Sequence, residues 1–301
     1  MKKNNELFGS LLVIIAGVLW GISGVFVRYF TGLGISSWTQ TFFKVGFAGI
    51  ALLCYCLIFD RQALKIKLKD LWTVLGSGLI SLVFFTICYY STIQATTMSV
   101  AATLLYLAPS MVMVMSAIFF KEKITKTKIV SCIIAFIGCF FVAGLIGSGA
   151  TLGAKAILTG ILSAFGYATY SIFSQAAMNR GYSPITVTTY TFVFAAIGSA
   201  FFLHPAEISA GMAQAGTAKF VLLLMLMSVV VSLLPYISYT NGLKRTQPSK
   251  ASIMASVEPI TATVTGAVVF HELPDFWGYL GIACVIGAIV LLNVDAFRKK
   301  A

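Results

Sequence analysis

Two stretches of the chain decide the fold: SVAATLLYLAPSMVMVMSAIFFKE at 99–122 and SKASIMASVEPITATVTGAVVFHE at 249–272. They align without gaps and share seven identical residues in 24. Each is a mostly apolar run with a proline near its middle and a glutamate at its end. A helix needs about 20 apolar residues to cross a bilayer. The pair therefore predicts two related halves, each containing a membrane-spanning helix of this kind.

The composition of the whole chain indicates a membrane protein. Of 301 residues, 59% are hydrophobic and 10% are charged, and the mean hydropathy is +0.95, whereas soluble domains are about 45–50% apolar and about 25% charged. Continuous apolar runs without period-2 alternation favour helices over barrel strands. The ten predicted helices are approximately 8–29, 38–59, 71–92, 97–120, 128–147, 155–177, 184–204, 219–242, 249–271 and 276–296.

Lysine and arginine concentrate in alternate loops. With the amino terminus inside, 17 of the 21 fall in predicted cytoplasmic segments, while Arg28, Lys155 and Lys219 lie outside and Lys44 lies within a helix. This bias satisfies the positive-inside rule for an even number of helices. We therefore expect a multi-pass protein of the cell (cytoplasmic) membrane with both termini cytoplasmic. Topology explains the net charge of +12, so no nucleic-acid partner is expected.

The two halves are expected to have opposite orientations, because five helices per half is an odd number. We predict an all-α membrane protein with ten transmembrane helices in two inverted five-helix repeats, residues 1–150 and 151–301. Inverted repeats are common in secondary transporters, whose substrate site lies near the bilayer midplane where the halves meet. The six cysteines fall inside apolar segments without metal-ligand spacing, which indicates free thiols and no metal site.

Short motifs in both halves carry a family resemblance. They are Leu19-Trp20-Gly21, Lys44, Leu107-Ala108-Pro109 followed by Lys121-Glu122, and Val257-Glu258-Pro259 followed by His271-Glu272-Leu273. With these motifs the whole chain resembles the drug/metabolite transporter (DMT) superfamily, in its EamA-type ten-helix branch. The resemblance implies transport of amino acids, related metabolites or amphipathic toxins. Lys44 departs from the arginine usual in this branch, and a lysine lacks the planar fork with which arginine binds carboxylates.

Lys44 and Glu258 are the ionisable residues furthest inside predicted helices. A charge at mid-membrane costs roughly 2.5–3.5 kcal/mol even on a permissive scale, so each should face protein or water. Each has a polar stripe at helical spacing: Ser37, Gln40 and Thr41 beside Lys44, and Thr261 and Thr265 beside Glu258. Two roles fit. The residues bind the two charges of a zwitterion, with Glu258 also able to carry a proton, or they pair with each other or with backbone carbonyls as structural contacts.

Aromatic residues cluster near the same predicted cavity: Trp20, Tyr89, Tyr90, Tyr106, Tyr167, Tyr170, Tyr236 and Tyr239. Such rings can stack on a flat or amphipathic cargo while their hydroxyls donate hydrogen bonds. Many membrane tyrosines instead anchor the lipid interface. The candidate substrate-binding residues are Lys44, Glu258, Trp20, Tyr89, Tyr106, Tyr167, Tyr170 and Tyr239.

Pro109 and Pro259 lie well inside the fourth and ninth predicted helices. Each removes one backbone hydrogen bond, and the matched kinks can serve as hinges for alternating access, expose carbonyls to substrate, or bend the helices for packing. Glu122 and Glu272 end the same helices at opposite membrane faces. They are candidate gate contacts, with exposed helix-end charges as the alternative.

The sequence shows no phosphate-binding loop, catalytic triad or ATPase motif. We therefore expect no enzyme activity, no cofactor and no ATPase subunit; the energy would come from a gradient of the cargo or of protons. The predicted function is a secondary transporter that exports small polar or amphipathic metabolites, amino acids first among them. The alternatives are efflux of toxic amphipathic or cationic compounds and flipping of a lipid-linked substrate. The expected partners are a small-molecule substrate, the lipid bilayer and protons.

Overall fold

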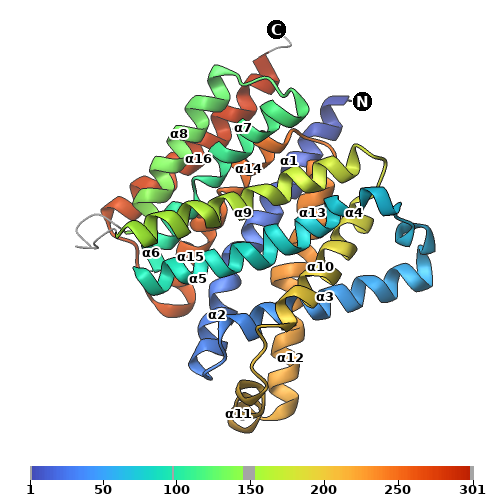
Figure 1. Ribbon diagram of the computed structural model, residues 1–301. Helices are drawn as coiled ribbons and strands as arrows, with labels where there is room; N and C mark the ends of the chain where they lie inside the picture. Colours follow the sequence, from blue (N-terminus) through green and yellow to red (C-terminus); the bar gives the residue numbers. More distant parts are fainter. Residues whose placement is uncertain (1, 97, 145–152, 299–301) are drawn as a thin grey trace.

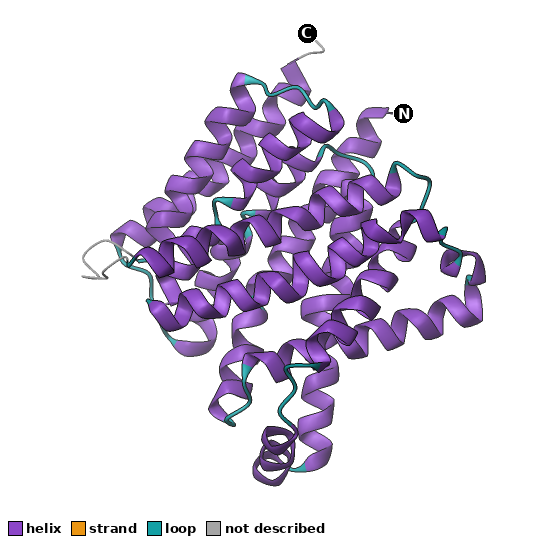
Figure 2. Cartoon of the chain, viewed as in Figure 1, coloured by secondary structure: helices purple, strands orange, loops and turns teal. Residues whose placement is uncertain are grey.

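The computed structural model describes residues 2–96, 98–144 and 153–298, and all regular secondary structure in these ranges is helical (Figure 2). The first half forms α1 (Lys2–Gly21), α2 (Ser23–Gly32), α3 (Ser37–Phe59), η1 (Arg61–Leu64), η2 (Leu68–Asp70), α4 (Leu71–Leu75), η3 (Gly76–Phe84), α5 (Phe85–Ala95), α6 (Met98–Leu105), α7 (Ala108–Phe120) and α8 (Lys126–Val142). The second half forms α9 (Ala154–Met178), α10 (Pro184–Ala200), α11 (Pro205–Ala215), α12 (Thr217–Met227), η4 (Ser228–Leu233), α13 (Leu234–Leu243), α14 (Pro248–Ala255), α15 (Glu258–Phe270) and α16 (Phe276–Arg298).

Most of these elements join into membrane-spanning segments. Within the described residues, eight segments are long and apolar enough to cross a bilayer, and α10 with α11, bent by 100°, would make a ninth. The helix α8 has 17 residues and packs along the spanning helix α16 (Figure 1). Residues 145–147 of the predicted helix 128–147 lie outside the described residues. The all-helical, multi-pass fold class is confirmed, and the helix count agrees broadly with ten.

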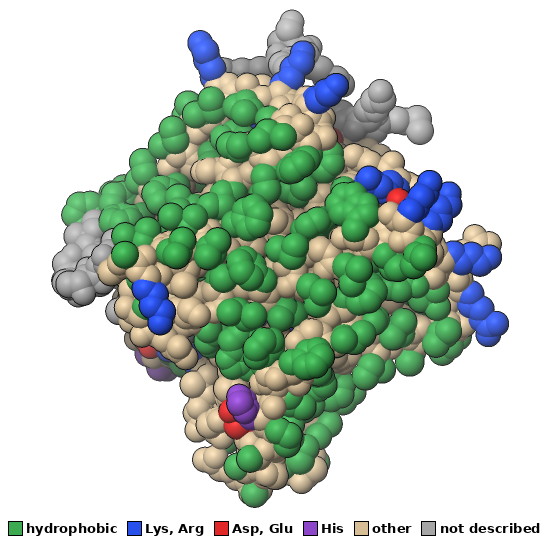
Figure 3. All heavy atoms as spheres, in the orientation of Figure 1, with side chains coloured by type: hydrophobic (Ala, Val, Ile, Leu, Met, Phe, Trp, Pro, Cys, Tyr) green, Lys and Arg blue, Asp and Glu red, His purple; other side chains and the backbone are tan. Residues whose placement is uncertain are grey.

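Large apolar side chains cover the outside of the bundle. Phe59 is 74% exposed and Val268 is 70% exposed, as expected of side chains that lipid covers. Figure 3 shows Lys and Arg gathered along the upper and right-hand edges of one face, near the start of α1 and the end of α16. We call this the basic end; it is formed by the connections 60–70, 121–125, 179–183 and 244–247. The opposite end is formed by 33–36, 201–216 and 271–275.

Two predicted kinks are full helix breaks. Residues 106–107 separate α6 from α7, and residues 256–257 separate α14 from α15. The proline two or three residues further on explains both. Pro109 and Pro259 have no N–H for the carbonyl four residues earlier, and their rings clash with it. We call 106–107 the first break and 256–257 the second break.

The helices α7 and α15 also end alike. Lys121 has φ of 56° and His271 has φ of 58°, a left-handed conformation that is uncommon outside glycine. The N–H of the next residue, Glu122 or Glu272, donates to a carbonyl six residues earlier at 3.2 Å, which closes a helix C-terminus. The two helix ends, which lie 150 residues apart in the sequence, therefore have the same backbone geometry.

The first long helix of each half packs into the other half. The helix α1 contacts α13, α14 and α15, while α9 contacts α5, α6 and α7. The helix α3 packs against α10. As a result, α1 lies beside the second break and α9 lies beside the first break.

Two features of the fold differ from the predicted helices. The helix α11 at the opposite end begins at Pro205, a favoured first residue because its fixed φ suits a helix and its missing N–H is not needed there. It lies at the bottom of Figure 1. The π-helical segments η3 and η4 interrupt the third and eighth predicted helices; wide turns of this kind are frequent at functional sites.

Candidate functional site

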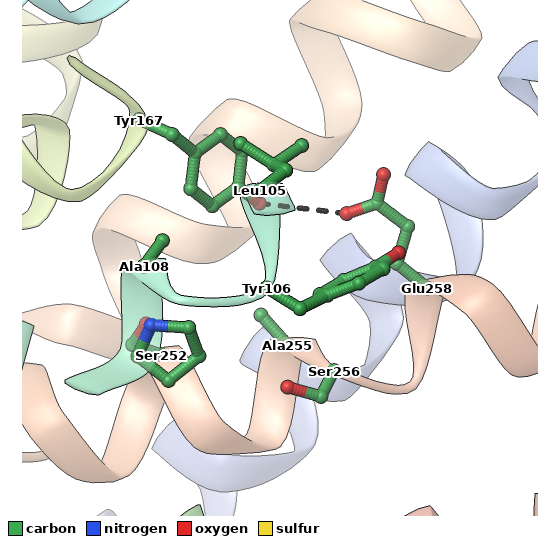
Figure 4. Close-up of a pocket in the computed structure, with 9 residues that line it drawn as sticks. Leu105, Tyr106, Ala108, Tyr167, Ser252, Ala255, Ser256 and Glu258 are labelled. Carbon is green, nitrogen blue, oxygen red and sulfur yellow. Dashed lines mark hydrogen bonds between the residues drawn. The ribbon is translucent and has the colours of Figure 1, made fainter. Parts of the chain in front are cut away.

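The two helix breaks meet at a small cavity (Figure 4). Nine residues line it: Leu105, Tyr106, Ala108 and Pro109 near the first break, Ser252, Ala255, Ser256 and Glu258 near the second, and Tyr167 on α9. The space open to the centre of a water-sized sphere is about 10 Å³, which is room for about one water. Residues of both halves of the chain therefore line the cavity.

Glu258 carries the charge in this cavity. It is the first residue of α15, where the helix dipole favours a negative charge. Tyr167 donates a hydrogen bond of 3.4 Å to Oε2 (dashed in Figure 4). Five further side chains interact with the carboxylate electrostatically: Lys44, Tyr89, Tyr106, Cys139 and Tyr236. Groups from α3, α5, the first break, α8, α9 and α13 thus interact with one carboxylate.

Lys44 lies deep in the protein on α3, and part of its surface is accessible. Its charge interacts with that of Glu258, but among the described residues no ion pair within 4 Å joins the two. Its backbone oxygen accepts a hydrogen bond of 2.6 Å from Ser228 Oγ, which ties α3 to η4. The two charges are therefore separated in this structure.

Trp20 on α1 packs against aromatic side chains next to the cavity, although it does not itself line the cavity. Its side chain is 9% exposed, and its ring centroid lies 6.4 Å from that of Tyr167 and 5.2 Å from that of Tyr236. The neighbouring Gly21 lets α1 approach the second break, because a Cβ there would lie 2.5 Å from the backbone oxygen of Glu258. The position of α1 and that of Glu258 are therefore coupled.

Tyr170 and Tyr239 belong to the buried core beside Trp20. The Tyr170 hydroxyl bonds Thr240 Oγ1 at 2.7 Å, and the Tyr239 hydroxyl bonds Ser171 Oγ at 2.7 Å. Neither residue lines the cavity. Of the other candidates, Tyr106 and Tyr167 line the cavity with Glu258. Lys44 and Tyr89 interact electrostatically with its carboxylate, and Trp20 packs on Tyr167.

Three residues at the site are absent from the sequence-based candidates. Tyr236 interacts with Glu258 and packs on Trp20; it belongs to the predicted aromatic cluster, but nothing in its spacing distinguishes it. Ser252 and Ser256 line the cavity. Ser256 stands 150 residues after Tyr106, so the repeat itself marks it as a cavity position.

Glu122 forms a buried network at the basic end. Its side chain is 6% exposed and its Oε1 lies 2.6 Å from Lys128 Nζ. The same oxygen accepts a short hydrogen bond from Ser249, and Lys128 Nζ donates to Gln247 Oε1 at 2.7 Å. The network joins the end of α7 and the start of α8 to the segment that begins α14. Glu122 is therefore not the exposed helix-end charge of the alternative interpretation.

Glu272 makes the corresponding contact at the opposite end. Arg28 on α2 donates to its two oxygens at 2.7 and 2.9 Å, and the Glu272 side chain is 56% exposed. The hydrogen bond from Arg28 holds the pKa of this carboxyl below its usual range. Both contacts cross between the halves, but only the one at the basic end is buried.

The chain is similar to known transporters over its full length. The sequence profile of the EamA-like transporter family matches residues 7–144 and again 154–294. An uncharacterized transporter of Archaeoglobus fulgidus is 26% identical over 94% of this chain and 96% of its own length. The uncharacterized inner membrane transporter YicL of Salmonella typhimurium is 23% identical over 97% of each chain. A crystal structure of another protein superposes with a TM-score of 0.78 at 16% identity, covering 97% of this chain and 99% of that one.

Proposed function

This chain belongs to the EamA-like transporter family, and on that premise we propose that it is a secondary transporter that exports amino acids or related small polar metabolites. The observation that carries the proposal is the cavity at the two helix breaks, where Glu258 is surrounded by hydroxyls and aromatic rings. Transporters with inverted repeats bind substrate at such discontinuous helices, where the repeats meet. The family profile matches the chain twice, which supports two repeats.

A zwitterion suits the charges of the site. Glu258 and Lys44 are opposite charges held apart, so each can engage one end of an amino acid. The prolines leave the carbonyls of Leu105 and Ala255 without their usual helical donor, and both residues line the cavity. Carbonyl oxygens and aromatic faces attract an ammonium group. The ammonium is therefore placed at Glu258 and the substrate carboxylate toward Lys44.

Alternating access follows from the contacts at the two ends. The Glu122–Lys128 network closes the seam at the basic end, and the Arg28–Glu272 pair closes it at the opposite end. Opening one end requires its contact to break while α7 or α15 turns about its helix break, with Pro109 and Pro259 as the hinges. The charge bias supports a cytoplasmic location of the basic end.

Protons are the proposed coupling ion, with Glu258 as the carrier. A carboxylate that is deep in the protein and unpaired with a cation can take up a proton when no ammonium is present. Exchange of a proton for substrate on one group would couple efflux to the proton gradient. Uncoupled facilitated movement is the alternative mechanism for the same site.

A second candidate cargo is an amphipathic cation. Tyr106 and Tyr167 line the cavity beside the carboxylate, and Trp20 packs against Tyr167 and Tyr236 next to it, which favours this cargo. Moving a cation outward against the membrane potential costs about 2.3 kcal/mol per charge per 100 mV. This cargo therefore demands proton coupling, whereas amino-acid export does not.

Counterflow in liposomes tests the proposal. Liposomes that contain the purified protein are loaded with unlabelled amino acids, and uptake of radiolabelled amino acids is measured. We expect accumulation by the wild type and loss of it in Glu258→Gln and in Lys44→Ala. The matched controls Asp275→Asn and Lys126→Ala remove the same charges at the ends of the bundle and should transport normally.

Other outcomes would redirect or end the proposal. Wild-type rates in both Glu258→Gln and Lys44→Ala, at equal insertion, would contradict the site. Absence of amino-acid counterflow together with efflux of a fluorescent cation that collapses with the proton gradient would establish the second candidate instead.

A further inference from the structure

A second, larger pocket lies at the basic end, away from the helix breaks. Its volume is about 460 Å³. It is formed by the connection from α3 to η2 and by the turn between α9 and α10, and its lining includes Asp60, Lys65, Lys67, Arg180, Tyr182 and Ser183. No residue of this lining belongs to the cavity of Glu258.

One wall of the pocket is held rigidly by a polar network. Arg180 Nε lies 3.3 Å from Asp70 Oδ1, and its guanidinium lies 4.8 Å from the ring centroid of Trp72. Tyr182 donates to Asp70 Oδ2 at 2.7 Å and accepts from the backbone N–H of Lys67 at 3.0 Å. The network neutralises Asp70 and fixes the backbone that carries Lys67.

The remaining charge in the pocket is positive. Lys65 and Lys67 are exposed, and neither forms an ion pair within 4 Å among the described residues. Asp60 also lines the pocket and keeps its negative charge, while its Oδ1 accepts a hydrogen bond of 3.2 Å from the N–H of Ala63 that begins η1. Against the two lysines the net charge of the pocket remains positive. Ser183 precedes the 17-residue α10, whose N-terminus adds a partial positive charge. The pocket therefore suits an anion.

The surroundings of the pocket are apolar and exposed. Phe59 directly precedes Asp60 and is 74% exposed, Leu68 directly follows Lys67 and is 85% exposed, and Trp72 is 47% exposed. A free anion gains nothing from such a rim. A phospholipid places its phosphate in the pocket and its acyl chains along the apolar surface, and basic pockets on the cytoplasmic side of membrane proteins bind lipid head groups.

We propose that the pocket between residues 60–67 and 180–186 binds the phosphate of an anionic glycerophospholipid from the leaflet at the basic end. Lys65 and Lys67 supply the charge contacts, the N-terminus of α10 adds its partial positive charge, and Leu68 and Phe59 border the acyl chains. The proposal is independent of the cargo and of the site at Glu258.

Binding of a short-chain lipid to the purified full-length protein in detergent tests the assignment. Dioctanoyl phosphatidylglycerol is titrated and its dissociation constant measured, with dioctanoyl phosphatidylcholine and inorganic phosphate as separate arms. The variant is Lys65→Gln with Lys67→Gln. Its matched control is Arg61→Gln with Lys69→Gln, which removes equal charge from the same connection but outside the pocket lining. All four positions are exposed, and equal melting temperatures establish equal folding.

We expect saturable binding of the phosphatidylglycerol that weakens about 10-fold or more in the pocket variant and less than about 3-fold in the control. Equally weakened phosphatidylglycerol binding in both variants would show that general surface charge causes the binding, and would overturn the site. Competition by inorganic phosphate at the same concentration as the lipid would identify a free-anion site and overturn the lipid assignment. Equal affinity for phosphatidylcholine, or no saturation, would do the same.

Discussion

At the scale of single residues, two tyrosines on α9 differ in the partner that their hydroxyl group bonds. Tyr167 donates to Glu258, whereas the hydroxyl of Tyr170, one turn further along α9, bonds Thr240 in the core. Sequence spacing puts both residues on one stripe and cannot tell a cavity hydroxyl from a core hydroxyl. Only the packing of α9 between α5 and the first break decides which of them reaches the carboxylate.

The two tyrosines should therefore respond differently to loss of the hydroxyl. We expect Tyr167→Phe to lower transport several-fold, since a hydrogen bond contributes about 0.5–1.5 kcal/mol, with little change in melting temperature. Tyr170→Phe should lower the unfolding free energy by about 1 kcal/mol and leave the affinity for substrate unchanged. Counterflow and thermal unfolding in detergent measure the two effects. A reversed pattern would move the site away from Glu258.

The sequence identifies ionisable residues more reliably than polar uncharged ones. Lys44 and Glu258 stand out because a charge is costly in an apolar helix, and this cost can be judged without a structure. Tyr236 and Ser256 carry no such cost. Their role at the site depends on three-dimensional packing that no local pattern encodes.

At the scale of elements, the two ends of the bundle differ in burial. Glu122 and Glu272 occupy equivalent places after α7 and α15, yet one is enclosed by Lys128 and Ser249 and the other meets Arg28 at the surface. Exposed ion pairs contribute little, because solvent screens them. Loss of one partner from a buried pair leaves an uncompensated charge.

Neutralising the two glutamates should therefore have unequal effects. We expect Glu122→Gln to lower the unfolding free energy by about 3 kcal/mol and Glu272→Gln to have no measurable effect on it. Adding Lys128→Met to Glu122→Gln should recover most of the stability, because no buried charge then remains. Thermal unfolding of the three variants checks this. Equal melting temperatures for the two single variants would contradict the buried network.

The pH response of the Arg28–Glu272 pair follows from the lowered pKa of Glu272. A lowered pKa means that the pairing is fully present above the ordinary value of 4.5 and is lost as the pH falls through the lowered pKa. Spin labels at Gly32 and Leu273, both at the opposite end, should keep one distance distribution between about pH 5.5 and 8. The distribution should broaden only below about pH 4.5. In Glu272→Gln it should not change with pH.

The sequence predicts the elements well where hydrophobicity alone sets them. The predicted spans 38–59 and 155–177 agree with α3 and α9 within about a residue at each end. At the two breaks the prolines predict only kinks, because a proline indicates a lost hydrogen bond but not how far the helix unwinds. The wide turns η3 and η4 and the extra helix α11 have no local signal of comparable strength and depend on packing.

At the scale of the whole molecule, the orientation rests on the distribution of charge. The basic end carries most Lys and Arg, and the positive-inside rule predicts that this end faces the cytoplasm. Single cysteines at Gln62 and Ser209, exposed at the basic and opposite ends, test it with a membrane-impermeant maleimide on intact cells. We expect labelling of Ser209→Cys but not of Gln62→Cys, with the parent protein as background. Labelling of Gln62→Cys alone would invert the assignment.

The cavity between the helix breaks holds about one water, far less than the roughly 300 Å³ or more of typical ligand pockets. A cargo larger than water can occupy it only after the halves move apart. The protein must therefore swell locally during each cycle, so every turnover passes through a form that is wetter and less closely packed at the two breaks than this structure.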